Sequence, residues 1–242
     1  MRVYITMGPG CEGLRGSKYT LGSFAYGESI KKLIEPCESF MLDSGAFTFL
    51  QKTKKGGAVD LDWDSYADAY AQFIKQTGID LYLELDIDLL VGYERVKALR
   101  AKLETVTGRP SIPVWHRSRG KDEYLRLCES HPYVAVGGIA IGDIKPAEYR
   151  HFPWFIEQAH ERGAKVHGLG FTRTELLHKY RFDSVDSSSW TCGGRFGALC
   201  WFDGREVHQH AKRFGQTVDG ETANAHNFAE WVKFQQYADE NL

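Results

Sequence analysis

Short apolar runs alternate with helical patterns along almost the whole chain. The runs are apolar or β-branched throughout rather than alternating with polar residues, which is typical of parallel strands buried on both faces. They predict strands at Arg2–Thr6, Phe40–Asp43, Leu81–Asp88, Ile112–His116, Val134–Ile139, Val166–Leu169 and Phe182–Asp186. An eighth strand is expected near Ala198–Phe202.

The segments between these runs carry apolar residues at helical spacing, and several end at glycine or proline, which commonly stop helices. They predict helices at Asp64–Gln76, Tyr93–Val106, Pro146–Arg162 and Thr172–Tyr180, with a last amphipathic helix at Glu221–Leu242. Repeated strand–helix units imply a parallel sheet with right-handed crossovers.

Seven or eight such units in 242 residues favour an α/β chain folded as a single (β/α)8 TIM-like barrel over an open sheet. No GxGxxG motif follows the first strand, so the usual dinucleotide fingerprint is missing. Because no linker, repeat or low-complexity tract divides the chain, we expect one domain over 1–242, with 205–242 as a C-terminal helical extension.

Composition and charge narrow the class of protein. The content of 43% hydrophobic and 26% charged residues is that of an ordinary globular chain. The formal net charge of -2 lacks the basic surplus of proteins that bind nucleic acid mainly through phosphates, so such binding would need a local patch. The chain has no apolar run of membrane-spanning length and no signal sequence at its N-terminus, and its five cysteines show no tight spacing. We therefore expect a cytoplasmic protein without a membrane partner or a disulfide framework.

Polar side chains follow nearly every predicted strand at its carboxyl end. The strands deliver Asp43, Asp86, His116 and Asp186 in turn, and the ends of two other strands are rich in glycine. A single aspartate after a strand is more often a helix cap or a turn residue, and a single histidine is more often structural. In a barrel, however, these ends converge above one mouth, where active sites lie.

The residue types suggest a chemistry for that mouth. Two carboxylates in different environments can divide the roles of nucleophile and base, as in glycosyl transfer. Aspartate is a natural acceptor for the paired N–H groups on the edge of guanine, and glycines let a flat ligand approach the backbone. The pattern indicates a purine-like base held near a glycosidic carbon and a carboxylate.

Three motifs resemble a known family. MLDSGAF resembles the DSGGF segment of tRNA-guanine transglycosylases, AVGGIAIG their GGLAVGE segment, and VHGLG their MGVG segment, in the same order over residues 40–190. The compact length and the SVDSSSW ending are closest to phage-encoded DNA-guanine transglycosylases of the DpdA type, which insert 7-deazaguanine bases into DNA. If the chain is phage-encoded, its place is the host cytoplasm.

The resemblance implies catalytic roles for two aspartates. Asp186 matches the nucleophile that attacks C1′, expels guanine and holds the sugar covalently. Asp183 is the alternative, because the family's FDC motif can also be laid on Phe182-Asp183-Ser184. Asp43 matches the acid that deprotonates the incoming base or assists the attack.

The resemblance also implies a base-binding set. Asp86 matches the residue that grips the N1 and 2-amino edge, and His116 stands where the family has a glutamine near the base carbonyl. His167 stands where a methionine covers the base. The full expected set comprises Ser44, Asp86, His116, Gly137, Gly138, Ile139, His167 and Gly168.

The chain departs from the tRNA enzymes in its zinc site. Their CxCxxC pattern with a later histidine is absent here, so no cofactor is expected. The only substitute ligands are Cys192, Cys200, His208 and His210, whose spacing fits no common zinc motif. The alternative is that they are buried thiols and surface histidines.

Basic residues after two predicted strands are candidate phosphate contacts. They are Lys52, Lys54, Lys55, Arg117, Arg119 and Lys121, and the alternative is a solvated charged loop. Arg15 and Lys18 are further candidates. An enzyme of this type must flip its target base or use single strands, and stacking by Trp190 or Trp115 would help.

The leading interpretation is a pentosyltransferase that exchanges guanine in DNA for a 7-deazaguanine base such as preQ0. Alternatives are exchange in tRNA, hydrolysis of a nucleoside or deazapurine, and a non-catalytic barrel subunit. The sequence leaves the oligomeric state, the 7-substituent and the DNA context open.

Overall fold

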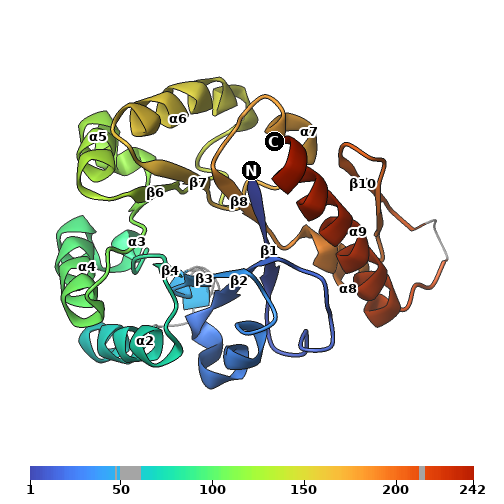
Figure 1. Ribbon diagram of the computed structural model, residues 1–242, viewed down its shortest axis with the longest axis horizontal. Coiled ribbons are helices and arrows are strands. Elements are labelled where there is room, and N and C mark those ends of the chain that lie inside the picture. Colours follow the sequence, from blue (N-terminus) through green and yellow to red (C-terminus); the bar gives the residue numbers. More distant parts are fainter. Residues whose placement is uncertain (47, 50–60, 213–215) are drawn as a thin grey trace.

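The computed structural model describes residues 1–46, 48–49, 61–212 and 216–242. Its centre is an eight-stranded sheet in the order β4-β3-β2-β1-β8-β7-β6-β5, and every pairing is parallel. The strands are β1 (Arg2–Met7), β2 (Tyr19–Ser23), β3 (Ser39–Asp43), β4 (Leu81–Tyr82), β5 (Val114–Trp115), β6 (Tyr133–Val136), β7 (Lys165–Gly168) and β8 (Ser184–Ser187). Helices surround the sheet on its outside (Figure 1).

The pairing of β1 with β8 curls the sheet into a TIM-like arrangement. The edge strands β4 and β5 form no ladder with each other, and the barrel is not closed there. A single parallel bridge joins the residues beside them, Leu83 and Ile112, with a hydrogen bond of 2.8 Å from the Ile112 N–H to the Tyr82 carbonyl. The α/β class with a parallel sheet is therefore confirmed, and a TIM-like barrel is consistent with it.

One expected strand lies elsewhere. Leu199–Phe202 is β9, which pairs antiparallel with β10 (Val207–His210) in a separate two-stranded sheet. The eighth strand of the main sheet is β2, between β1 and β3. Its sequence YTLGS has no continuous apolar run, although four of its five residues are buried, because its position in the sheet buries threonine and glycine as well.

The helices and short 3-10 segments connect these strands. They are η1 (Phe24–Leu33), α2 (Trp63–Thr77), α3 (Asp88–Val91), α4 (Tyr93–Thr107), η2 (Arg117–Arg119), α5 (Gly120–Ser130), η3 (Pro146–His151), α6 (Phe152–Glu161), α7 (Thr174–Leu177), η4 (Ser189–Thr191), α8 (Cys192–Phe196) and α9 (Gly220–Asn241). Among the described residues, none of these helices has the length and apolar character needed to cross a membrane.

Local signals account for the helices that the sequence predicted well. The carboxylate of Asp62 accepts from the Asp64 N–H at the start of α2, and Gly78 ends the helix with a φ of 70°. Tyr70 and Ile74 lie on its buried face. Pro146–Arg162 instead divides into η3 and α6.

Helix α9 belongs to the wall of the sheet, although we expected a helical extension over 205–242. Residues 205–219 contribute β10 and irregular chain, and the helix begins only at Gly220. The buried Gln235 amide donates to the carbonyls of Val3 (2.6 Å) and Tyr19 (2.8 Å) and accepts from the Lys18 N–H (2.7 Å). The helix thus covers β1, at the right of the sheet in Figure 1.

The sheet separates two apolar clusters. Its inside is filled by Tyr4, Tyr19, Leu21, Met41, Leu83, Ile112, Val114 and Ala135. A larger cluster lies between its outside and the helices. Because the interior is packed with side chains, a ligand can enter only at the ends of the strands.

Candidate functional site

A cavity of about 410 Å³ lies at the carboxyl ends of the parallel strands. Five expected site residues line it: Asp43, Asp86, His116, Gly138 and Asp186. They come from the ends of β3 and β8 and from the segments after β4, β5 and β6. Residues far apart in the sequence therefore meet at one mouth, as the barrel interpretation expects.

Asp186 is held by three donors near the end of β8. Its Oδ1 accepts from the Gly170 N–H at 2.6 Å and lies 3.2 Å from Nε2 of His167. Among the described residues, its Oδ2 has only the hydroxyl of Thr6, at 3.4 Å. One oxygen is thus fixed, while the other is weakly engaged.

The alternative nucleophile, Asp183, lies at the other end of the sheet. It directly precedes β8, and its Oδ2 accepts from the Val166 N–H at 2.8 Å and lies 2.8 Å from Nε2 of His160. The carboxylate therefore has two structural partners at the amino ends of β7 and β8. Of the two aspartates, only Asp186 lines the cavity.

Asp43 ends β3 and accepts from the Gly45 N–H at 2.9 Å. The pKa of Asp43 is raised to about 6, chiefly by burial and also by the charges of Asp186 and Asp86, which together outweigh the lowering effect of hydrogen bonds from Gly45 and Ser23. The carboxyl can therefore exchange a proton near neutral pH.

Asp86 and His116 form a tight pair on the side of β4 and β5. Asp86 Oδ1 lies 2.6 Å from Nε2 of His116. Burial lowers the pKa of His116, but the hydrogen bond and charge of Asp86, with the charge of Asp88, outweigh burial and raise it above its ordinary value. The ring is thus stabilised as a cation beside an aspartate.

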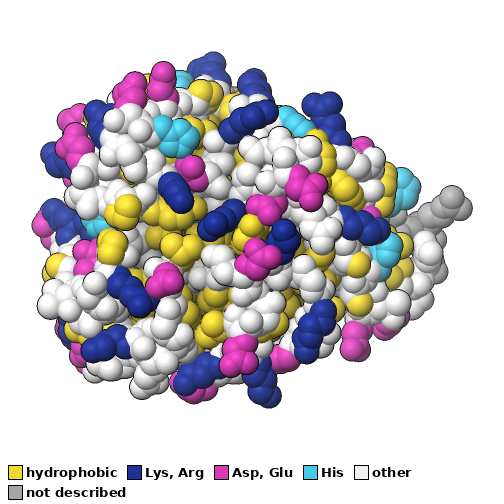
Figure 2. Space-filling view, in the orientation of Figure 1, with side chains coloured by type: hydrophobic (Ala, Val, Ile, Leu, Met, Phe, Trp, Pro, Cys, Tyr) yellow, Lys and Arg dark blue, Asp and Glu magenta, His cyan; other side chains and the backbone are white. Residues whose placement is uncertain are grey.

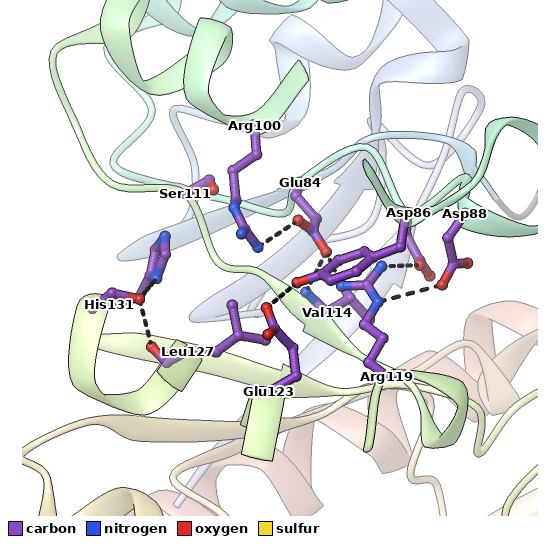
Figure 3. A network of polar contacts seen from close by, with 12 residues as sticks. Glu84, Asp86, Asp88, Arg100, Ser111, Val114, Arg119, Glu123, Leu127 and His131 are labelled. Atoms are coloured by element: carbon purple, nitrogen blue, oxygen red, sulfur yellow. Dashed lines mark hydrogen bonds and ion pairs between the residues drawn. The ribbon is translucent and has the colours of Figure 1, made fainter. Parts of the chain in front are cut away.

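Arg119 lies under this pair rather than on the surface, so the expectation that it contacts phosphate is wrong. Its side chain is 1% exposed, and its guanidinium bonds Glu84 at 2.6 Å and Asp88 at 3.3 Å. The fully buried Glu84 also accepts from Arg100 at 3.0 Å. In Figure 3 the Arg119 guanidinium points toward Asp86 and Asp88. Buried carboxylates need a cationic partner, and the inward position of the Arg119 guanidinium supplies one.

Asp86, Asp88 and His116 also bring three possible metal ligands within 4.8 Å of one another. Arg119 lies 3.3 Å from Asp88 and 3.8 Å from Asp86, so a cation already compensates the two carboxylates. The donor set therefore does not require a metal ion.

The glycine-rich segment after β6 forms one wall of the cavity. A side chain at Gly137 would meet the His116 ring at 2.7 Å, so glycine is needed for the ring to take its place. Gly138 has a φ of 84°, which favours glycine. Ile139 is buried behind this wall.

Four further expected contacts lie behind the cavity lining. Ser44 and His167 are fully buried, and His167 lies between the Ser184 hydroxyl (2.5 Å) and Asp186. A side chain at Gly168 would meet the Phe182 ring at 3.1 Å, and the space next to Gly137 is filled by the His116 ring. These four residues contact residues of the cavity region but do not line the cavity themselves.

Thr6, Asp88 and Arg195 also line the cavity and were missing from the expected site. Thr6 and Asp88 are the last residues of two predicted strands; the rule that selected Asp43 applies to both, and it marks Asp88 together with Asp86. Arg195 lies on α8, after β8, and no motif marks it.

The proposed zinc ligands do not come together. The sulfur atoms of Cys192 and Cys200 are 3.5 Å apart and buried. On the β9–β10 hairpin, His208 lies opposite Trp201 and stacks on its ring, whereas Cys200 lies opposite Gln209. Since neighbouring strand residues point to opposite faces, the two histidines lie on the face away from the thiol.

Of the other candidate phosphate contacts, the structure describes Arg117 but not the three lysines after β3. Lys52, Lys54 and Lys55 lie outside the described residues. Arg117 is half exposed and bonds Glu148 at 2.7 Å. On the face shown in Figure 2, basic and acidic side chains are interleaved without a continuous patch of one sign. Trp190 is buried and donates to the Thr6 carbonyl at 2.9 Å, so it is not available for stacking.

Comparisons with known proteins add little to this geometry. No family model matches the chain, and no curated protein matches it. Similar solved structures include the carboxyl transferase domain of Rhizobium etli pyruvate carboxylase with pyruvate (14% identity, TM-score 0.48) and the same domain without it (13%, 0.47). Each comparison covers 98% of this chain and 48% of the other. The chain thus spans about half the length of these neighbours.

Proposed function

We propose that this chain is a base-exchange transglycosylase that replaces guanine in DNA with a 7-deazaguanine base. The observation that carries the proposal is the meeting of Asp43, Asp86 and Asp186 at one cavity, each with different partners. The motifs that resemble guanine transglycosylases place the same three aspartates in the roles of proton carrier, base acceptor and nucleophile. A curled parallel sheet with its site at the carboxyl ends of the strands suits this use.

In the first half of the reaction, Oδ2 of Asp186 attacks C1′ of the target nucleotide. A C1′–O bond forms, the C1′–N9 bond breaks, and its electron pair leaves with guanine. Oδ1 stays bonded to the Gly170 N–H and beside His167, which keeps the carboxylate oriented during the attack.

Asp43 carries the proton between the two halves. In its protonated form it gives a proton to the departing guanine, which leaves as a neutral base. The resulting carboxylate then takes the N9 proton of the incoming 7-deazaguanine, whose N9 attacks C1′ and releases Asp186. A pKa of about 6 for Asp43 suits both transfers near neutral pH.

Asp86 and His116 are assigned to recognition of the base. Asp86 accepts from the N1 and 2-amino groups, and the His116 ring next to it is suited to the base carbonyl. Arg119 and Glu84 support Asp86 from behind. Gly138 lets the flat ring lie against the backbone.

The deciding experiment incubates the chain with DNA that carries labelled guanine, with and without a free 7-deazaguanine, followed by nucleoside analysis. We expect loss of label from the DNA and gain of the 7-deazaguanine nucleoside only when the free base is present. Release of guanine without the acceptor base would indicate a hydrolase. Exchange in tRNA but not in DNA would move the proposal to the other polymer.

A further inference from the structure

A second cavity, also of about 410 Å³, lies between the segment after β5 and the helices η3 and α6. Its lining is mostly apolar and includes Trp115, Ile144, Phe152, Trp154 and Phe155. Four of these five side chains are buried and form the floor, while the partly exposed Trp154 stands at the edge. The proposed base exchange does not use this cavity.

The two cavities share a wall. His116 lines the first cavity, and its chain neighbours Trp115 and Arg117 line the second. On the facing side, Gly138 lines the first and Ile144 the second, and the Ile144 N–H donates to the Gly138 carbonyl at 3.2 Å. A polymer with one residue in the first cavity would therefore pass next to the second.

The aromatic rings of the second cavity are held in place. The Trp115 indole N–H donates to the Gly120 carbonyl at 2.7 Å, and the ring centroid lies 4.6 Å from that of Phe155. The Trp154 ring lies 5.0 Å from Phe155 on the other side. Trp115 is as buried as Trp190, so the partly exposed Trp154 is the ring that can stack on a nucleobase, without regard to base identity.

Charges at the rim suit a phosphate next to such a base. The Lys121 ammonium lies 5.0 Å from the centroid of the Trp154 ring and forms no ion pair within the described part of the chain. Arg117 is half exposed and bonds the Glu148 carboxylate, which is the acidic group of the lining. Of the lysine and the arginine in the lining, Lys121 is thus the one that stays available for an anion.

We infer that the second cavity binds the base of a nucleotide that flanks the exchange site in single-stranded DNA, with Lys121 next to its phosphate. The inference rests on the proposed function, because that function places the exchanged nucleotide in the neighbouring cavity. It explains how a chain with a net charge of -2 holds a polyanion: aromatic stacking replaces a broad basic surface.

The first test measures affinity for a fluorescent oligothymidine with one central guanine. We expect Trp154→Ala to weaken binding by about ten- to a hundredfold, the usual effect of removing a stacking ring. Lys121→Gln should weaken it several-fold and lower the salt slope by roughly 0.7, the value for one contact to a single strand. Lys179→Gln is the matched control: Lys179 lies 5.2 Å over Tyr180, between α7 and β8 at the amino ends of the strands, and its loss should change nothing.

The second test removes the flanking base instead of the protein ring. An oligonucleotide with an abasic site next to the guanine, on the 5′ or the 3′ side, should lose affinity for the wild-type chain at one of the two positions. The same abasic site should lower the affinity of Trp154→Ala by almost nothing, because the variant has already lost the ring on which the base stacks. This cycle does not depend on whether the variant is slightly destabilised.

The outcomes separate this inference from the proposed exchange. Binding of the free 7-deazaguanine, measured by calorimetry, should be equal in wild type, Trp154→Ala and Lys121→Gln. If the abasic cycle shows coupling but no base is ever exchanged, the cavity is a nucleotide site and the proposed function is wrong. Coupling with an RNA oligonucleotide but not with DNA would overturn the assignment to DNA. Equal abasic losses in wild type and Trp154→Ala, or no binding of either oligonucleotide, would overturn the inference altogether.

Discussion

Two aspartate–histidine pairs serve the same cavity from different parts of the sheet, and their surroundings differ. Asp86 lies 2.6 Å from His116, with the buried Arg119 guanidinium 3.8 Å away. Asp186 lies 3.2 Å from His167 and is bonded by the Gly170 N–H. The first aspartate has a histidine ring and a buried guanidinium beside it, whereas the second is fixed by a backbone donor.

Under the proposed function, this difference suits chemically identical side chains to different work. Asp86 has the His116 ring at 2.6 Å and the Arg119 guanidinium at 3.8 Å, an arrangement that suits an acceptor for a ligand's N–H groups. A backbone donor on one oxygen of Asp186 orients the other without a cation bonded to it, which suits a nucleophile. Asp43 lies within the influence of both pairs, and both charges raise its pKa.

The largest expected effect comes from removing the oriented carboxylate. Asp186→Ala should lower exchange by about a thousandfold or more, because no covalent sugar adduct can form. Exchange of labelled guanine and mass spectrometry of trapped protein–DNA adducts measure it. Asp183→Ala is the control, since its carboxylate lies at the other end of β8, and exchange should persist. The reverse result would make Asp183 the nucleophile and contradict the contrast between the two pairs.

The next largest effect is expected from removing Arg119, the cation 3.8 Å from Asp86. Arg119→Met leaves the buried Glu84 with Arg100 as its remaining cation and should lower the free energy of unfolding by about 3 kcal/mol. Arg117→Met, two residues away in η2 and half exposed, should change it by less than about 0.5 kcal/mol. Urea unfolding monitored by tryptophan fluorescence measures both variants. Equal, small losses would mean that Arg119 is not a structural part of the site.

Asp86→Asn tests whether the first pair recognises the edge of the base. An amide presents a donor where the carboxylate accepted two hydrogens, so binding of a free 7-deazaguanine should weaken by roughly 1–3 kcal/mol. An analogue without the 2-amino group should lose less. Calorimetry with the two ligands gives the difference, and equal losses would remove Asp86 from the base edge.

The smallest effect concerns Asp43 and depends on pH. Its folded-state pKa of about 6 lies above the ordinary value of 3.8, so ionisation costs the folded state free energy. The stability associated with this group is fully present below about pH 4 and is lost as the pH rises through 6. Asp43→Asn should therefore raise the free energy of unfolding by on the order of 1–2 kcal/mol at pH 7.5 and by almost nothing at pH 4. Urea unfolding at both pH values measures it, and a gain independent of pH would contradict the raised pKa.

The sequence by itself determined the α/β class, most of the strand positions and the residues that stand at their carboxyl ends. These features are local: apolar runs mark buried parallel strands, and polar residues directly after them must lie at the edge of the sheet. Asp43, Asp86, His116 and Asp186 were identified in this way, and they line one cavity.

Only the tertiary structure decided what each of these residues touches. Strand β2 and the inward position of Arg119 depend on neighbours distant in the sequence, namely β1 and β3 for the strand and the buried Glu84 for the arginine. Likewise, only the structure placed Asp186 at the cavity and Asp183 before the start of β8, at its other end. Burial and charge pairing are properties of the packed chain, and a pattern along the sequence carries no direct record of them.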